Sequence, residues 1–372
     1  MDNMEGRTTV ERMMMQNASM QRIPINGSIE LLPLCNMNCK MCYVRLSKDE
    51  MNRQGRMRSG KEWLSLGEKM QKAGVLFLLL TGGEPLLHPD FKEIFVGLKK
   101  MGMILTINTN GTLIDENWVQ FFEKYKPRRI NITLYGTSEK VYGELCQYPQ
   151  GFNKVINAIK MLKENDIDVK ISGSIAKSNY EDVEKIIAMG EELGVPAFCD
   201  TYMMPQNRER SMPFDMQSRL DPICAAKARV KALKLEMKED IFKEYARTKL
   251  LEIANAPDKE EIPSCMTCNA GKCSFTINWQ GEMRPCVMLT SPAKNVFEED
   301  FNVSWKYIYT TCDKILLANK CSACKKRKLC RTCAASALLE EGSYEAVPKY
   351  MCAYTDETIR LLKEELQDEE VF

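Results

Sequence analysis

The chain has 372 residues, with 52 Lys and Arg against 51 Asp and Glu and a formal net charge of +1. At roughly 100–200 residues per domain, this length allows two domains or one large barrel with an appendage. The balanced charge gives no reason to expect nucleic acid or an anionic membrane as a partner. The longest apolar run, residues 75–80, is far shorter than the roughly 20 residues that cross a bilayer, and residues 1–17 lack the apolar core of a signal peptide. We therefore expect a soluble, cytoplasmic protein that spans no membrane.

Cysteine and histidine are used unevenly, with 16 Cys and one His. The single histidine, His88, excludes a multi-histidine metal site and disfavours Ser/His/Asp hydrolysis; we expect it to pack near a helix start rather than to act in catalysis. Cysteine makes up about 4% of the chain, below the roughly 8–10% of disulfide scaffolds. Because the cytosol keeps thiols reduced, the excess of cysteine indicates metal binding.

The predicted elements alternate between strand and helix. Strands are predicted at residues 29–34, 75–80, 103–108, 129–134, 168–175 and 196–202, with amphipathic helices between them at 91–101, 116–125, 152–165 and 180–193. This alternation is typical of βα units and predicts a parallel sheet with right-handed crossovers. Six such units give an α/β fold.

A CxxxCxxC motif, Cys35, Cys39 and Cys42, follows the first predicted strand, with Tyr43 directly after it. A [4Fe-4S] cluster normally takes four cysteines, so three thiolates on one tight loop would leave one iron open. An open iron can bind the amino and carboxylate groups of a small molecule. The alternative is a zinc knuckle, which needs a fourth Cys or His nearby, and residues 44–87 contain neither.

This loop resembles the cluster loop of the radical S-adenosylmethionine (radical SAM) superfamily, although Met41 stands where that family usually has an aromatic residue. The resemblance implies a partial (β/α)6 TIM-like barrel, here over residues 25–205, with the chemistry at the carboxyl ends of its strands. It also implies that SAM binds the open iron, and that an electron from the cluster cleaves SAM to methionine and a 5′-deoxyadenosyl radical. We expect residues 1–24 to form a flexible arm.

Further SAM contacts are implied at the ends of later strands. The segment Thr81-Gly82-Gly83-Glu84 resembles the second motif of the family, in which the backbone and the glutamate hold the SAM amino group. Weaker candidates by resemblance or position are Tyr43, Asn110, Thr133, Ser172 and Ser174. A plain Asn-Gly turn is an equally good interpretation of Asn110, and alternation places both serines on one face of a strand without showing which face.

Ten cysteines follow residue 264, and eight of them fit two sites of four thiolates. By spacing alone, zinc ribbons and iron-sulfur clusters are equally good interpretations. The arrangement resembles the SPASM extension of radical SAM enzymes, which binds two auxiliary [4Fe-4S] clusters, except that two residues instead of three separate Cys330 from Cys333. By resemblance, the first auxiliary cluster takes Cys268, Cys273, Cys286 and Cys333, and the second takes Cys321, Cys324, Cys330 and Cys352. Cys265 is the reserve for Cys273, and Cys312 is left over.

The expected organisation is therefore the arm and barrel, a helical bridge over residues 206–264, a SPASM domain over 265–354 and a capping helix over 355–372. SPASM enzymes as a class modify peptides or proteins, which implies a peptide or protein substrate for crosslinking, epimerisation or a similar modification. Val287 stands where formylglycine-forming maturases carry an Asp, which weakens that interpretation. A small-metabolite substrate and a non-enzymatic iron-sulfur or zinc-binding protein are the alternatives.

The expected partners follow from the same resemblance. About 25 residues precede the first strand, too few for a leader-peptide-binding domain, so leader recognition would need a separate protein or the barrel mouth. A flavodoxin- or ferredoxin-type reductant would supply electrons. On the sixth strand, Cys199 and then Asp200 are the candidates for a barrel-lining hydrogen donor or base, and a buried structural cysteine is the alternative interpretation of Cys199.

Overall fold

The structure is a computed structural model and describes residues 8–204, 210, 218–330 and 332–366. The strands are β1 (Asn26–Glu30), β2 (Phe77–Thr81), β3 (Ile104–Thr109), β4 (Arg129–Thr133), β5 (Val169–Ser174), β6 (Ala197–Asp200), β7 (Ser264–Cys265), β8 (Ser274–Ile277), β9 (Glu282–Arg284), β10 (Lys294–Asn295) and β11 (Leu316–Leu317). The α-helices are α1 (Thr9–Gln21), α2 (Lys48–Gln54), α3 (Gly60–Lys72), α4 (Phe91–Lys100), α5 (Glu116–Lys124), α6 (Glu139–Cys146), α7 (Gly151–Glu164), α8 (Val183–Glu192), α9 (Pro222–Met237), α10 (Glu239–Ala254), α11 (Phe301–Cys312), α12 (Asn319–Ala323), α13 (Ala334–Glu341) and α14 (Lys349–Glu364). Three short 3₁₀ helices are η1 (Pro85–Leu87), η2 (Lys177–Asp182) and η3 (Lys325–Lys328).

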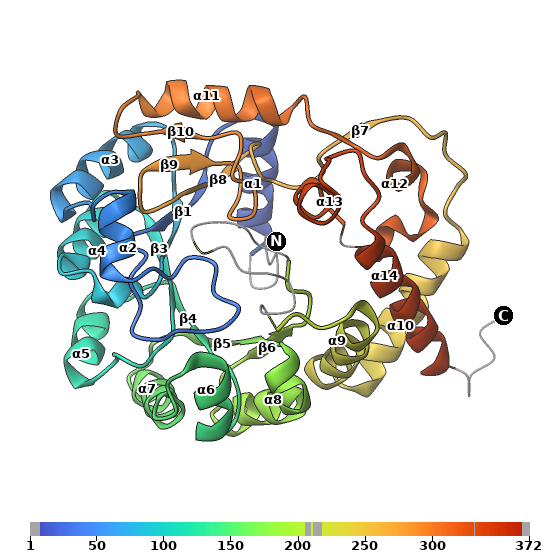
Figure 1. Cartoon of the computed structure of the whole chain (residues 1–372), viewed down its shortest axis with the longest axis horizontal. Coiled ribbons are helices and arrows are strands. Elements are labelled where there is room, and N and C mark those ends of the chain that lie inside the picture. Colours follow the sequence, from blue (N-terminus) through green and yellow to red (C-terminus); the bar gives the residue numbers. More distant parts are fainter. Residues whose placement is uncertain (1–7, 205–209, 211–217, 331, 367–372) are drawn as a thin grey trace.

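A nine-stranded sheet in the order β10-β9-β8-β1-β2-β3-β4-β5-β6 forms the centre of the molecule. Strands β1 to β6 pair in parallel in sequence order, and helices α3 to α8 lie in an arc outside them (Figure 1). The parallel α/β sheet that the strand and helix alternation predicts, and the partial barrel that the resemblance implies, are therefore confirmed. A second lobe, made of α9, α10, α12, α13 and α14, lies beside β6 (Figure 1).

The two faces of this sheet differ in polarity. Residues that point toward the helices are apolar and fully buried, for example Ile107, Ile132 and Ile171. The alternate residues point to the concave side, which is the barrel interior, because side chains of a strand alternate between its faces. Polar groups pair across this inner face: the Ser28 and Thr276 hydroxyl oxygens are 2.8 Å apart. The barrel thus encloses hydrogen-bonding groups rather than an apolar core.

The C-terminal part of the chain contributes to the barrel sheet itself. Strand β8 pairs in parallel with β1, and β9 and β10 continue the sheet in antiparallel fashion. Helix α11 covers this extension, with the Phe275 ring 5.5 Å from Phe301 and 6.1 Å from Trp305. Strands β8, β9 and β10 of the C-terminal region therefore form one edge of the barrel sheet.

The expectation of a flexible N-terminal arm is wrong for residues 9–21, which form helix α1. Thr8 and Glu11 make a capping box: the Thr8 hydroxyl accepts from the Glu11 amide, and the Glu11 carboxylate accepts from the Thr8 amide. Met15 and Ala18 are buried on one face of the helix, packed with Phe77 at the amino-terminal end of β2. Helix α1 therefore closes the floor of the barrel.

The helical segments near the C-terminus also differ in detail from expectation. The predicted bridge contains two helices, α9 and α10, which meet at Lys238, a residue with φ of +62°. The helix expected from residue 355 begins at Lys349 and packs along α9. None of the helices in the described ranges is long and apolar enough to cross a membrane.

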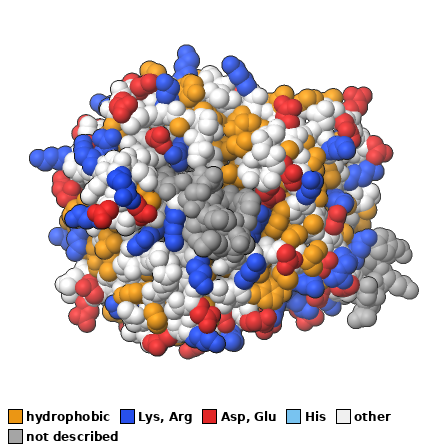
Figure 2. Space-filling view, in the orientation of Figure 1, with side chains coloured by type: hydrophobic (Ala, Val, Ile, Leu, Met, Phe, Trp, Pro, Cys, Tyr) orange, Lys and Arg blue, Asp and Glu red, His pale blue; other side chains and the backbone are white. Residues whose placement is uncertain are grey.

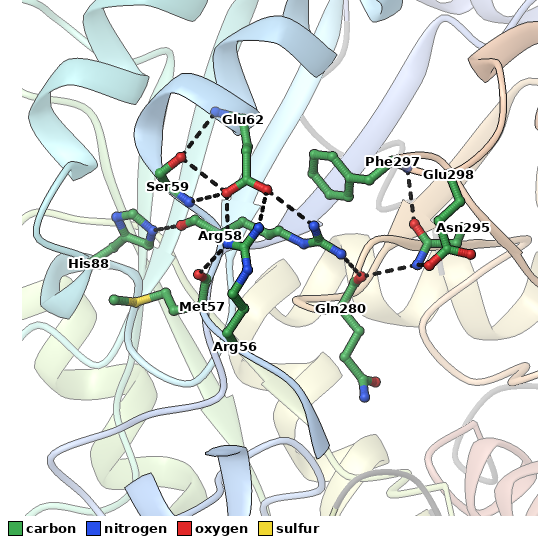
Figure 3. A network of polar contacts seen from close by, with 10 residues as sticks. All are labelled: Arg56, Met57, Arg58, Ser59, Glu62, His88, Gln280, Asn295, Phe297 and Glu298. Carbon is green, nitrogen blue, oxygen red and sulfur yellow. Dashed lines mark hydrogen bonds and ion pairs between the residues drawn. The ribbon is translucent and has the colours of Figure 1, made fainter. Parts of the chain in front are cut away.

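Arg58 joins the barrel to the C-terminal extension (Figure 3). Its guanidinium donates to Glu62 Oε1 at 3.1 Å and to the Gln280 carbonyl oxygen at 3.2 Å, and lies 4.3 Å from the centre of the Phe297 ring. The Arg58 carbonyl oxygen is 2.9 Å from His88 Nε2. Since His88 Nδ1 accepts from the Asp90 amide at 3.1 Å, Nε2 carries the hydrogen and the imidazole is neutral. His88 is thus a structural residue at a helix start, as expected.

This geometry predicts a pH effect on stability. Burial lowers the pKa of His88 below its ordinary value of 6.5. The folded state then binds this proton less readily than the unfolded chain, so stability is lost as the pH falls below about 6.5. In His88→Gln the side chain can still donate and accept but does not titrate, so the wild-type melting temperature should fall relative to the variant between pH 7.5 and pH 5.5. Thermal unfolding of both proteins checks this, and a pH-independent difference would contradict it.

Candidate functional site

The CxxxCxxC loop lies directly after β1, at the carboxyl ends of the parallel strands. Cys39 is buried, and Cys35 and Cys42 are half-buried. Backbone amides point at two of the sulfurs, from Met37 to Cys35 Sγ at 3.4 Å and from Arg45 to Cys42 Sγ at 3.3 Å. Amide donors stabilise a negatively charged sulfur, so the loop is built for thiolates.

The electrostatics of the loop favour a bound cation. Burial raises the pKa of Cys35 to about 12 and also raises that of Cys42, whereas a hydrogen bond with Cys146 and then burial raise the pKa of Cys39. Thiols of this kind stay protonated at neutral pH unless a metal replaces the proton. The amide donors at Cys35 and Cys42, and the position of all three cysteines on one loop, fit residues that would hold an iron-sulfur cluster. In the described ranges, no three Cys, His, Asp or Glu side chains are grouped closely enough to hold a single metal ion.

The Gly82-Gly83 pair allows the end of β2 to lie against the cluster loop. The Gly83 amide donates to the Leu32 carbonyl at 2.7 Å, and the Glu84 amide donates to the Leu34 carbonyl at 2.9 Å. A Cβ on Gly83 would lie 2.3 Å from the Leu34 oxygen, and Gly82 has a φ of +146° that favours glycine. Only glycine permits this approach, so these two residues set the position of the cysteine loop.

Glu84, which the resemblance implies as a contact of the SAM amino group, lies just after β2 and is bonded within the chain. The side chain is fully buried, and its oxygens accept from the Thr109 hydroxyl at 2.8 Å, the Asn110 amide at 2.8 Å and the Leu86 amide at 3.1 Å. Burial raises the pKa of Glu84 to about 7 against these donors. These hydrogen bonds join the end of β2 to the end of β3, and a contact between Glu84 and SAM stays a prediction.

Asn110 extends this connection to the cysteine loop. Its Nδ2 donates to Asn36 Oδ1 at 2.9 Å and lies 3.6 Å from Cys35 Sγ. Its Oδ1 accepts from the Thr112 amide and hydroxyl at 2.9 and 2.7 Å, and Thr112 in turn accepts from Asn36 Nδ2 at 2.8 Å. Asn110 is therefore more than a turn residue, because it binds the loop that carries the cysteines.

The weaker candidates Thr133, Ser172 and Ser174 lie on the inner face of the barrel. Thr133 is the register partner of Ser172, and Ser174 is the register partner of Asp200. All three hydroxyl residues are half-buried, which settles the face that the sequence left open. Their position makes them available to a ligand inside the barrel.

Tyr43 contacts a residue that sequence reasoning missed. The Tyr43 carbonyl accepts from the Arg210 amide at 3.1 Å, and the Arg210 guanidinium donates to the Cys39 carbonyl at 2.9 Å. This places a positive charge beside the cysteine loop. Arg210 lies 171 residues from Cys39 in the sequence and belongs to no motif, so no local signal indicated it.

Cys199 does not line the barrel, which corrects its assignment as a hydrogen donor. A Cβ on Gly173, its register partner, would lie 2.9 Å from Cys199 Sγ and 3.3 Å from Ile186 of α8. The thiol therefore faces the helix layer, where burial raises its pKa to about 12. Asp200, the next residue, is exposed and is the register partner of Ser174 on the inner face of the barrel. It therefore stays a candidate for a hydrogen donor or base.

The late cysteines form two groups. Burial, and then the charges of Cys330, Cys352 and Cys324, raise the pKa of Cys321, so these four cysteines are linked electrostatically. Burial raises the pKa of Cys286 to about 11; two backbone hydrogen bonds oppose this rise, and the charges of Cys333 and Cys268 add to it. Cys273, which was expected in this group, is instead fully buried beneath α1.

Comparison with known sequences identifies relatives with several different activities, including probable GTP 3',8-cyclases. Residues 29–190 match the Radical SAM superfamily. The AdoMet-dependent heme synthase of Methanosarcina barkeri is 25% identical over 336 residues, which are 87% of this chain and 95% of the relative. The antilisterial bacteriocin subtilosin biosynthesis protein AlbA of Bacillus subtilis is 24% identical over 283 residues, which are 75% of this chain and 59% of the relative.

Solved structures show the same fold. SuiB of Streptococcus suis, bound to the precursor peptide SuiA, aligns with a TM-score of 0.68 and 17% identity over 92% of this chain and 80% of that chain. Native anSMEcpe with bound AdoMet aligns with a TM-score of 0.68 and 19% identity over 93% of this chain and 98% of that chain. At these identities the likeness is one of architecture.

The Gly83 contact predicts a severe local effect of one methyl group. In Gly83→Ala the new Cβ would meet the Leu34 oxygen at 2.3 Å, so the cysteine loop must move. We expect reconstituted protein to lose about four irons per chain, the content of one cluster. Gly143→Ala is the matched control, because its nearest atom is 3.1 Å away on the Pro149 side chain. Equal iron contents in the two variants, measured colorimetrically, would contradict the proposed constraint.

Proposed function

We propose that this chain, which contains a radical SAM domain over residues 29–190, is a radical SAM enzyme that abstracts hydrogen from a peptide or protein substrate. The residues that would hold the SAM-cleaving cluster are Cys35, Cys39 and Cys42, and eight late cysteines would hold two auxiliary clusters. When bound, the first cluster supplies the electron that cleaves SAM to methionine and a 5′-deoxyadenosyl radical. The protein positions the loop, the cofactor and the substrate.

One observation carries the proposal: the cysteine loop, the Gly82-Gly83 approach and the Asn110 connection meet at the carboxyl ends of the strands. In βα barrels this end is where ligands bind. Backbone close to the loop offers hydrogen-bonding groups to the amino acid part of SAM, and Arg210 adds a positive charge beside it. The inner-face hydroxyls of Thr133, Ser172 and Ser174 lie below the same rim.

The polarity of the barrel interior supports a peptide substrate. An extended peptide presents an N–H and a C=O at every residue, and these groups need partners when they leave water. The inner face supplies such partners, including the Asn108 and Asn131 side chains, whose amide groups are 2.8 Å apart. Two similar proteins also support a peptide substrate. AlbA is a bacteriocin biosynthesis protein, and SuiB, which shares the fold, binds a precursor peptide.

A small-molecule substrate is the second candidate, and one observation favours it. The heme synthase match spans nearly the whole of both chains, whereas the AlbA match spans 59% of AlbA. The two candidates separate in one experiment: reduced enzyme with SAM is given short peptides encoded beside its gene or, in parallel, iron porphyrins, the class of compound to which heme belongs. A mass change of a peptide with 5′-deoxyadenosine above the substrate-free rate supports the proposal, and modification of the porphyrin alone overturns it.

The electron source and location complete the proposal. A low-potential flavodoxin or ferredoxin would reduce the first cluster, and a separate leader-binding protein is a further candidate partner for peptide recognition. A reducing compartment such as the cytoplasm suits a chain with 16 cysteines.

The cluster assignment makes a quantitative prediction. Anaerobically reconstituted protein should contain about 12 irons and 12 sulfides per chain, four of each per cluster. Changing Cys35, Cys39 and Cys42 together to Ala should leave about eight of each and abolish 5′-deoxyadenosine formation with dithionite. Metal analysis and chromatography check both values. Stoichiometric zinc with about four irons would instead assign the late cysteines to zinc sites.

A further inference from the structure

Asn110 places a side-chain N–H group against a sulfur of the cysteine loop. Its Nδ2 lies 3.6 Å from Cys35 Sγ, and the Met37 amide nitrogen lies 3.4 Å from the same sulfur. The Cys35 thiol in turn donates to Asn36 Oδ1 at 3.9 Å, a contact that ends when the sulfur loses its proton. A thiolate in this place would therefore accept two N–H···S hydrogen bonds, one from the backbone and one from a side chain.

A closed ring of hydrogen bonds fixes the orientation of the Asn110 amide group. Asn110 Nδ2 donates to Asn36 Oδ1 at 2.9 Å, and Asn36 Nδ2 donates to Thr112 Oγ1 at 2.8 Å. The Thr112 hydroxyl closes the ring by donating to Asn110 Oδ1 at 2.7 Å, and the Thr112 amide donates to the same oxygen at 2.9 Å. Because Oδ1 faces two donors, Nδ2 is the atom that faces Asn36 and Cys35.

The backbone of Asn110 is held as firmly as its side chain. Its amide donates to Glu84 Oε2 at 2.8 Å, and the Thr109 hydroxyl donates to Oε1 of the same buried carboxylate at 2.8 Å. Gly111, with a φ of +75°, lets the chain turn back so that Thr112 reaches Asn110. Asn110 and Thr112 are buried, so water competes little for these hydrogen bonds.

Hydrogen bonds to cysteine sulfur change how readily an iron-sulfur cluster accepts an electron. Reduction adds negative charge, part of which the ligand sulfurs carry, and an N–H dipole that points at a sulfur stabilises that charge. Each such bond therefore favours the reduced state and raises the reduction potential. The effect grows where the surroundings are buried, because the local dielectric constant is low.

We propose that Asn110 is a positioning residue that acts through Cys35: its Nδ2–H group, held in place by Asn36 and Thr112, raises the reduction potential of the cluster on the CxxxCxxC loop. The inference rests on the proposed function, in which that loop binds a [4Fe-4S] cluster. It concerns a sulfur ligand and not the open iron, so it is testable without SAM. A weaker electron donor could then reduce the cluster than if the N–H group were absent.

The test measures midpoint potentials of full-length, reconstituted protein by EPR-monitored redox titration without SAM. The signal of the loop cluster is the part of the spectrum that disappears when Cys35, Cys39 and Cys42 are changed together to Ala. Asn110→Asp keeps the shape of the side chain and its Oδ1 acceptor but replaces the donor with an oxygen, whereas Asn110→Ala removes the donor without adding charge. We expect the equilibrium constant for one-electron reduction to fall about tenfold in Asn110→Ala, which is about 59 mV, and further in Asn110→Asp.

Asn38→Ala is the matched control. Asn38 is another asparagine of the cysteine loop, but its Nδ2 donates to Gln147 Oε1 at 2.8 Å instead of to a sulfur. Its midpoint potential should equal the wild-type value. Thr112→Val removes the hydroxyl that fixes the Asn110 amide while the donor remains, so it should lower the potential by less than Asn110→Ala does.

An unchanged midpoint potential in both Asn110 variants, with wild-type iron content, overturns the inference and leaves the proposed function standing. An equal fall in Asn38→Ala also overturns it, because any change in the loop would then have the same effect. Loss of about four irons from Asn110→Asp overturns it as well, since the side chain would then only hold the loop in place. Equal iron contents in the wild type and the triple Ala variant would show that the loop holds no cluster, and the proposed function and this inference then fail together.

Discussion

The structure depends on the close approach of two backbones, the end of β2 and the strand that leads into the cysteine loop. Gly83 donates to Leu32, Glu84 donates to Leu34, and no side chain fits between the two segments. This contact fixes the height and rotation of the loop against the sheet. The buried Glu84 and Asn110 then carry the same constraint to β3, so that three strand ends and the thiols form one rigid group.

Much of the barrel could be predicted because each βα unit has a local pattern, an apolar run followed by an amphipathic stretch. The Thr8 and Glu11 capping box that starts α1 is equally local, but the Met-rich segment after it has a weak apolar face, so its pattern does not predict a packed helix. The spacing of the late cysteines favours Cys321, Cys324, Cys330 and Cys352 as one set, and this assignment stays a prediction. Spacing could not show that Cys273 is buried with Met15 and Phe77, because that burial depends on how helix α1 packs on the barrel floor.

The error at Cys199 has a simple physical origin. Successive residues of a strand face opposite sides, so naming a strand is not enough to place a side chain inside a barrel. The neighbouring strand shows which face each residue of β6 occupies. Ile171 and Gly173 of β5 face α8, and Cys199 is the register partner of Gly173, so Cys199 faces α8 as well. The contact of Arg210 with the cysteine loop could not be predicted for a different reason: it connects residues 171 positions apart, and no local sequence pattern marks it.

The pairing of β8 with β1 bears on how the chain folds during synthesis. Ser28 and Thr276 are hydrogen-bonded neighbours separated by 248 residues. At translation rates of about 5–20 residues per second, β1 leaves the ribosome roughly 12–50 seconds before its partner. During that interval the barrel has an open edge strand, which other chains can pair with. The nascent protein therefore has a long period in which β1 can pair with other chains, and it ends when β8 pairs with β1.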